Sequence, residues 1–171
     1  TVSDEHKSDA DWRPSDKLTA VLNDSQGIVA TLLRGSRLPS ADFGITYSDG
    51  FSALLPHLAK MRASARLLSA DSRRAFVAGD VDGAADRVAA LYGMASHLTG
   101  ERLLISPLVA IAIHSLACSQ TEFLVNSGKL TAQGRQTLLD AMSRLQGDDP
   151  FGVRSGIMGE RGFLRTWLAT E

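Results

Sequence analysis

Apolar residues recur every three or four positions along most of this chain, which is the spacing of one face of an α-helix. No segment shows the alternation of apolar and polar residues that is typical of a strand. The pattern therefore predicts an all-α fold of about five helices in antiparallel hairpins, as a helical bundle or a short tetratricopeptide-like array. We expect the helices over residues 16–35, 52–78, 84–98, 103–125 and 131–147.

The clearest boundary between two of these helices is the joint Gly79-Asp80-Val81-Asp82-Gly83-Ala84. Glycine tolerates the left-handed conformation that ends many helices, so we expect Gly79 to close the first helix. Aspartate accepts hydrogen bonds from the free N–H groups that open a helix, which is the role expected of Asp80 or Asp82. Gly128 followed by Thr131 repeats the arrangement, and the two joints together predict two stacked helical hairpins.

The longest internal segment without helical spacing covers residues 36–50. It contains the turn formers Pro39 and Gly44 and the isolated rings of Phe43 and Tyr47. We expect an ordered loop that the rings hold against the domain, and this loop is a candidate surface for function.

The two ends of the chain differ from its middle. Residues 1–15 are polar and lack helical spacing, so we expect a flexible N-terminal arm ahead of a single helical domain over residues 16–171. The glycines between residues 152 and 162 predict a loose tail, and their spacing is not that of a nucleotide-binding loop. We expect the segment after them to dock on the core through Phe163, Leu164, Trp167 and Leu168.

Length and charge narrow the classes of function. A chain of 171 residues buries enough surface to form one domain. Lys and Arg number 18 against 19 acidic residues, and the formal net charge of -1 argues against binding to nucleic acid or to anionic membranes. The single cysteine, Cys118, cannot form an internal disulfide.

The longest apolar stretch, residues 103–118, is shorter than the about 20 residues that cross a bilayer, so we expect a buried core helix and no transmembrane span. The chain starts at Thr1 without a methionine or an apolar leader. We expect this of a processed or excised chain whose anchor, if it has one, lies outside it. The compartment stays open between the bacterial cell envelope or periplasm and the cytoplasm.

The sharpest chemical pattern is His114, Cys118 and Glu122, which share one stripe of a helix at i, i+4 and i+8. A stripe spread over two turns does not converge on a metal ion, and a cysteine nucleophile also needs an orienting group and oxyanion donors. The simpler interpretation is a core helix with a hydrogen-bonded histidine and an inert, buried cysteine. We therefore expect no catalytic residue, no metal site and no cofactor.

Candidate binding residues fall into two groups. Arg62 and Arg66 lie near one face of the helix expected over residues 52–78, with Arg73 further along, and can contact phosphate, carboxylate or an acidic partner. A solvated face with salt bridges to nearby aspartates is the simpler interpretation of these arginines. The second group lies in and beside the loop. The residues that we expect to bind a ligand are Tyr47, Phe51, His57, Arg62 and Arg66.

The joint that starts at Gly79, with an amphipathic helix on each side, resembles the helix-pair joint of tetratricopeptide-like units, although the aromatic and proline positions of that motif are not filled. Over most of residues 18–165 the chain also resembles an uncharacterised all-helical protein family of planctomycete-type bacteria. That resemblance implies an envelope-associated helical domain and no catalytic residue. It is carried by Leu54-Leu55-Pro56-His57-Leu58, Arg62, Arg66, Leu67-Leu68, Gly79-Asp80, Ala84 and Gly159-Glu160-Arg161.

These observations favour a non-enzymatic helical interaction or scaffold domain that binds a protein or peptide in a groove between hairpins or on the loop. One alternative is a small-molecule or lipid-binding bundle, which requires an enclosed apolar cavity beside His57, Arg62 or His114. Another is an enzyme of unknown class that uses the His114 stripe or the loop residues Asp42, Tyr47 and Asp49. The partner and the oligomeric state stay open.

Overall fold

The structure is a computed structural model that describes residues 12–52 and 54–170. That part of the chain folds into seven α-helices and one 3-10 helix, without a β-strand, which confirms the all-α prediction and corrects the expected number of helices. The elements are α1 (Asp16–Asp24), α2 (Gln26–Gly35), η2 (Tyr47–Ser52), α3 (Pro56–Val77), α4 (Val81–His97), α5 (Ile105–Asn126), α6 (Ala132–Met142) and α7 (Val153–Thr170). The arm predicted over residues 1–15 falls largely on residues 1–11, which lie outside the described residues.

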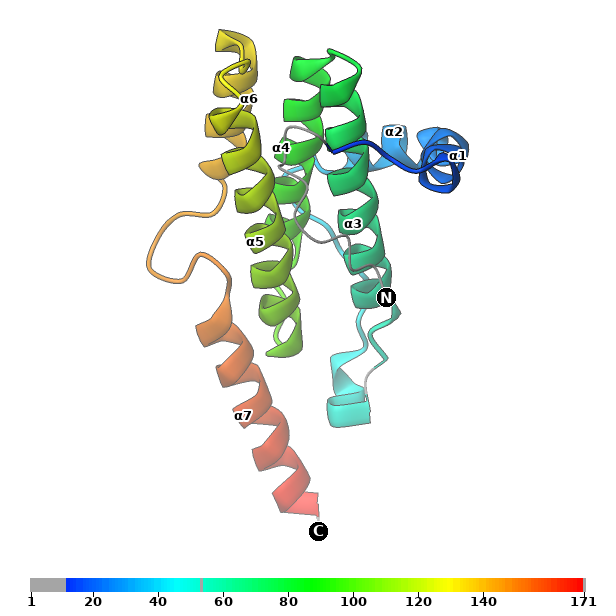
Figure 1. The fold of residues 1–171 in the computed structure, drawn as a ribbon. Helices are drawn as coiled ribbons and strands as arrows, with labels where there is room; N and C mark the ends of the chain where they lie inside the picture. The colour runs from blue at the N-terminus through cyan, green and yellow to red at the C-terminus, as the bar shows by residue number, and fades with distance from the viewer. Residues whose placement is uncertain (1–11, 53, 171) are drawn as a thin grey trace.

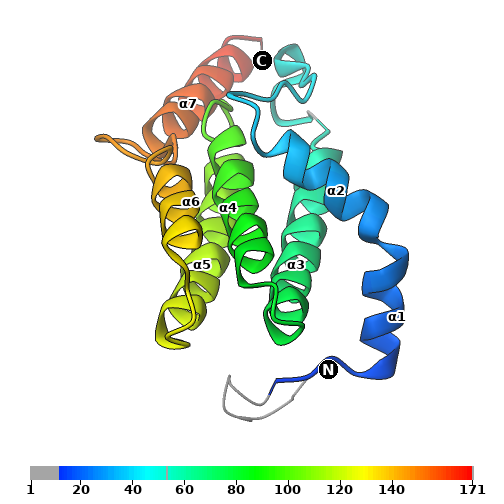
Figure 2. The same ribbon diagram turned by 90° about the horizontal axis from the view of Figure 1, so that it is seen from above.

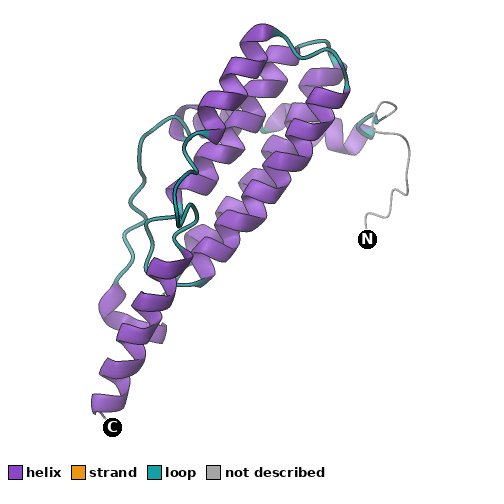
Figure 3. Cartoon of the chain, turned by 90° about the vertical axis from the view of Figure 1, so that its left-hand side faces the viewer, coloured by secondary structure: helices purple, strands orange, loops and turns teal. Residues whose placement is uncertain are grey.

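Helices α3, α4, α5 and α6 lie side by side, with α4 in the middle (Figures 1 and 2). α4 packs against α3, α5 and α6, and it supplies the largest share of the core. α1 and α2 cover one side of the α3–α4 pair, whereas α7 continues beyond the end of α5 (Figure 3). The core is built from apolar side chains of α2, α3, α4, α5 and α6, among them Val29, Leu68, Val88, Leu91, Tyr92, Ile113, Leu124 and Leu138.

The helix joints form as their residues predict. Gly79 has a φ of 87° and Gly128 a φ of 67°, both in the left-handed region that favours glycine. The Asp80 carboxylate accepts a hydrogen bond of 2.9 Å from the backbone N–H three residues on, and the Thr131 hydroxyl does the same at 2.9 Å. Side chains therefore satisfy the exposed N–H groups at the start of α4 and α6.

The segment predicted as one helix over residues 16–35 is two helices, α1 and α2, which change direction at Ser25. Asn23, Asp24 and Ser25 are poor helix formers, which weakens the chain there. The Gln26 side chain donates one hydrogen bond back to the Leu22 carbonyl oxygen, at 2.7 Å, and another into α3. The change of direction brings both short helices onto the bundle.

The glycine-containing tail is not loose, because residues 153–170 form α7. Asp149 caps this helix, since its two carboxylate oxygens accept hydrogen bonds of 2.9 Å from the backbone N–H groups of Val153 and Arg154. The glycines allow close packing. A Cβ at Gly152 would lie 2.0 Å from the Thr99 carbonyl oxygen, and one at Gly159 would lie 2.0 Å from the Arg102 carbonyl oxygen. At Gly156 the nearest atom, the Leu104 Cα, would be 3.0 Å away.

The C-terminal half of α7 makes fewer contacts with the bundle than the N-terminal half, which contains the closely packed glycines. Phe163 is partly buried and stacks on Tyr47 of η2 at 6.4 Å between ring centroids. Leu164, Trp167 and Leu168 are exposed, so the expectation that they dock on the core is wrong. The glycine segment that was expected to be loose is thus packed against the bundle, whereas the apolar segment that was expected to be packed is exposed except for Phe163.

Helix α5 is longer than its apolar run and extends over 22 residues. Within the described residues it is the one helix with the length and mean hydropathy, 1.5, of a membrane span, and a third of that stretch is buried in the bundle. Ala110, Ile113 and Ala117 pack inward against α3 and α4. The opposite side of α5 carries exposed apolar residues, so this core helix also forms part of the surface.

Candidate functional site

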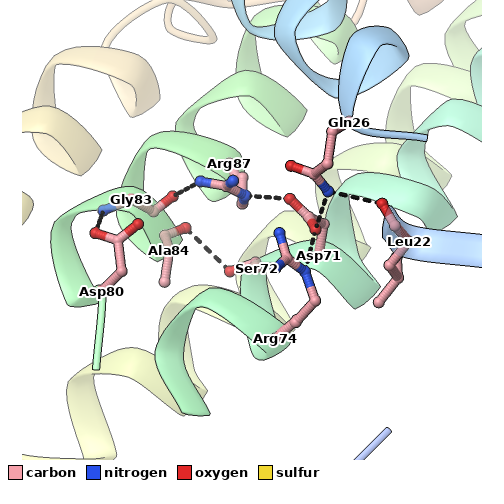
Figure 4. A network of polar contacts seen from close by, with 9 residues as sticks. All are labelled: Leu22, Gln26, Asp71, Ser72, Arg74, Asp80, Gly83, Ala84 and Arg87. Atoms are coloured by element: carbon pink, nitrogen blue, oxygen red, sulfur yellow. Dashed lines mark hydrogen bonds and ion pairs between the residues drawn. The ribbon is translucent and has the colours of Figure 1, made fainter. Parts of the chain in front are cut away.

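The most deeply buried charge is the carboxylate of Asp71 on α3, which is fully inaccessible to solvent. Its oxygens accept hydrogen bonds from Arg74 Nε at 2.7 Å, from Gln26 Nε2 at 3.1 Å, and from Arg87 Nε (Figure 4). Arg87 also donates to the Gly83 carbonyl oxygen at 2.8 Å. The network thus joins α2, α3 and α4.

Burial alone would raise the pKa of Asp71, but the hydrogen bonds from Arg74, Arg87 and Gln26 and the charge of Arg87 outweigh it and hold the pKa below its usual value. Perturbed carboxylates often mark active sites. Here the carboxylate has no contact with solvent, and all its partners belong to the network. We therefore assign Asp71 a structural role.

The loop over residues 36–50 covers a second polar cluster. His57 Nε2 at the start of α3 lies 2.8 Å from Glu101 Oε1, and both side chains are nearly buried. The two atoms are close enough for an ion pair but are not aligned as a hydrogen bond. Ser106 donates to the other oxygen of Glu101, and the Phe43 ring stacks on His57 at 4.4 Å.

An open cleft of about 310 Å³ lies beside this cluster, with Tyr47, Asp42, His97 and Glu101 in its lining. Phe43 lines the cleft as well, so the expected anchoring of the loop by its rings is observed. The candidate residue Phe51 lies in η2, but its side chain is outside the described part of the structure.

The other two candidates, Arg62 and Arg66, lie one turn apart on the exposed side of α3. They border a shallow hollow of about 240 Å³ whose floor includes Ala112, Ile113 and Leu116 of α5. Among the described residues, neither guanidinium forms an ion pair or a side-chain hydrogen bond. The expected salt bridges to aspartates are therefore absent from this pair within the described chain.

The other arginines of α3 are engaged. Arg73 donates to Gln120 Oε1 at 3.1 Å and lies over the Phe123 ring at 4.5 Å, and Arg74 pairs with Asp71. One helix thus carries arginines that hold the bundle together near its C-terminal end and arginines that face solvent near its N-terminal end.

The outward side of α5 continues the floor of that hollow. Ile105, Leu108 and Ile111 are exposed there, with Leu108 51% accessible, and Ala112 lies one turn from Leu108. We call the set Arg62, Arg66, Leu108, Ile111 and Ala112 the α3–α5 face. It is an apolar strip bordered by two cations.

The three residues of the predicted stripe on α5, His114, Cys118 and Glu122, do not form one site. Cys118 Sγ lies 3.6 Å from His114 Nδ1, and the Tyr92 hydroxyl donates to Cys118 Sγ at 3.7 Å. Cys118 is exposed, so the expectation of a buried cysteine is wrong. Glu122 lines a different hollow, of about 420 Å³, with Phe76. No group of three potential metal ligands occurs among the described residues.

Burial lowers the pKa of His114 below its usual 6.5, so the folded state favours the neutral imidazole. The unfolded chain binds this proton more readily, and stability is therefore lost as the pH falls from about 6.5 through the lower folded pKa. We expect His114→Gln to flatten the fall of the melting temperature between about pH 7 and pH 5. Melting curves of both proteins across this range test it, and parallel pH profiles would contradict it.

Sequence reasoning missed a third surface, on α7. Arg154, Arg161 and Arg165 follow one line along the helix at i, i+7 and i+11, and we call them the arginine row. A second line with the same spacing lies next to it and is also exposed: Ile157, Leu164 and Leu168, the apolar row. The spacing is visible in the sequence, but the glycines between these residues argued against a helix.

Comparisons of the chain with models of protein families, with curated proteins and with solved structures find no match.

Proposed function

We propose that this protein is a non-enzymatic helical interaction domain, and that its α3–α5 face binds an acidic amphipathic helix of a partner protein. The observation that supports it most is the combination of exposed Leu108 and Ile111 with two arginines that have no ion partner among the described residues. An amphipathic helix would lay its apolar side on α5 and place carboxylates against the guanidinium groups.

The alternatives have less support. The hollows described above are open to solvent, whereas a small-molecule bundle would need an enclosed apolar cavity. His114 and Cys118 are in contact, but within the described part of the chain no third group forms a hydrogen bond that would orient the histidine. The tetratricopeptide-like character of the helix pairs, and the envelope location that the family resemblance implies, stay predictions.

The test measures the binding of a fluorescent synthetic peptide helix with leucines on one side and glutamates on the other. We expect the double variant Arg62→Glu/Arg66→Glu to weaken binding about tenfold or more, because it replaces attraction by repulsion. Leu108→Ser should weaken it independently, and added salt should weaken binding to the unsubstituted protein.

The matched control is Lys60→Glu/Arg135→Glu, which reverses two exposed charges away from the α3–α5 face. It should bind as the unsubstituted protein does. Equal losses in both double variants would mean that the peptide responds to net charge alone, and the proposed face would be rejected.

A further inference from the structure

The surface of α7 has a second use, independent of the α3–α5 face. We propose that α7 lies on anionic phospholipid membranes, with its apolar row in the interfacial layer and its arginine row on the lipid headgroups. The helix spans 18 residues, and it extends beyond the end of the bundle (Figures 1 and 3). Such a helix can reach a flat surface without the bundle blocking its approach.

Charge is the first argument. The chain as a whole is nearly neutral, but α7 carries three arginines against one glutamate. That glutamate, Glu160, lies on the side of α7 that faces the bundle, where its Oε1 accepts a hydrogen bond of 3.0 Å from the Leu104 backbone N–H. The arginine row is exposed, and its side chains form no ion pair among the described residues. It therefore presents a line of positive charge that matches anionic headgroups.

The apolar row is the second argument. Leu168 is 62% accessible, and Trp167 beside it is 53% accessible, although exposure of such side chains to water is unfavourable. Interfacial helices combine an apolar side that contains tryptophan with a basic polar side. Tryptophan in particular prefers the headgroup region of a bilayer. Both features lie on one helix here.

The two rows favour a membrane over a partner helix. None of the three hollows described above has a lining residue on α7. Recognition of a partner helix uses a groove, whereas a lipid surface needs only the two rows. The close contacts of Gly152 and Gly159 fix the N-terminal half of α7 against the bundle, which keeps both rows turned outward.

The experiment is flotation of the full chain with vesicles of phosphatidylcholine alone or mixed with phosphatidylglycerol. We expect binding to the anionic vesicles and little to the neutral ones. Arg154→Gln/Arg161→Gln/Arg165→Gln should reduce binding at least about tenfold, since each arginine near an anionic surface contributes to it. Arg34→Gln/Lys60→Gln/Arg135→Gln, which removes three exposed positive charges from other helices, is the matched control and should bind normally.

Insertion is measured separately through Trp167, in a Trp12→Phe background so that one tryptophan reports. Its emission should shift to the blue when anionic vesicles are added, and Leu164→Ser/Leu168→Ser should abolish the shift while circular dichroism stays unchanged. Equal binding to both vesicle types, or an unaffected triple arginine variant, would overturn the proposal. So would a dimer in sedimentation that Leu164→Ser disrupts without vesicles, since a second copy would then cover α7.

Discussion

Replacing Asp71 by asparagine is expected to lower the free energy of unfolding by about 3 kcal/mol, because it leaves the largely buried Arg87 guanidinium without its counter-charge. The loss of one partner of a buried pair exposes the full desolvation cost of the other. The asparagine amide keeps one acceptor oxygen, which can serve Gln26 and Arg74, but it places an NH2 donor where the second oxygen accepted from Arg87. Urea unfolding followed by circular dichroism measures the change.

The control is Asp86→Asn, which removes the partner of Arg37 at the surface, where the two side chains are 42% and 68% accessible. Water screens such a pair, so the change should stay within about 0.5 kcal/mol. A similar small loss in Asp71→Asn would show that the carboxylate is not the anchor of α2, α3 and α4.

The carboxylate of Asp71 also makes the stability of the folded protein depend on pH in acid. Since the folded pKa of Asp71 is lowered from the usual 3.8, the unfolded chain takes up the proton first as the pH falls. The stability that the network contributes is present above about pH 4 and is lost below it, as the pH falls through the folded pKa. Asp71→Asn should therefore be less sensitive to acid in this range than the unsubstituted protein.

Adding one methyl group at Gly159 is expected to loosen α7. The new Cβ would lie 2.0 Å from the Arg102 carbonyl oxygen, which belongs to the backbone and cannot turn away. Overpacking of this kind costs about 1–3 kcal/mol, and the helix has few other contacts with the bundle to offset it. Trypsin should cut Gly159→Ala after Arg154 and Arg161 faster than it cuts the unsubstituted protein.

Gly162→Ala is the matched control, three residues along the same helix. Nothing lies within 4 Å of the position that its Cβ would take. Alanine is the better helix former by about 1 kcal/mol, so α7 should be as resistant to trypsin as before or more so. If Gly159→Ala also protected α7, the close approach to Arg102 would be refuted.

The local features of the fold were the predictable ones. Gly79, Asp80 and Thr131 act on their own neighbours in the chain, so their sequence context suffices to assign the joints. The change of direction at Ser25 is fixed partly by Gln26 reaching Asp71 on another helix, which no local pattern contains. From the sequence alone Gly159 is predicted to break a helix, because the backbone against which it packs lies far away in the chain.

For the candidate sites, too, local contacts were predictable, whereas the exposure of side chains was not. The i, i+4 spacing placed His114 and Cys118 in contact, as observed. Which side of α5 faces water depends on how three helices pack around it, and Cys118 was therefore wrongly expected inside. The exposure of Leu108 and of the apolar row has the same origin, since an apolar side chain is predicted as core unless its neighbours are known.

The small side chains of α4 limit which positions of this protein tolerate substitution. Ala84, Ala85 and Ala95 are fully buried where α4 meets its neighbours, and a Cβ at Gly93 would lie 2.3 Å from the Ser36 carbonyl oxygen. Because α4 packs against α2, α3, α5 and α6, a larger residue there alters several interfaces at once. The outward sides of α5 and α7 carry no such restriction, so substitutions there can alter what the protein contacts while the bundle stays as it is.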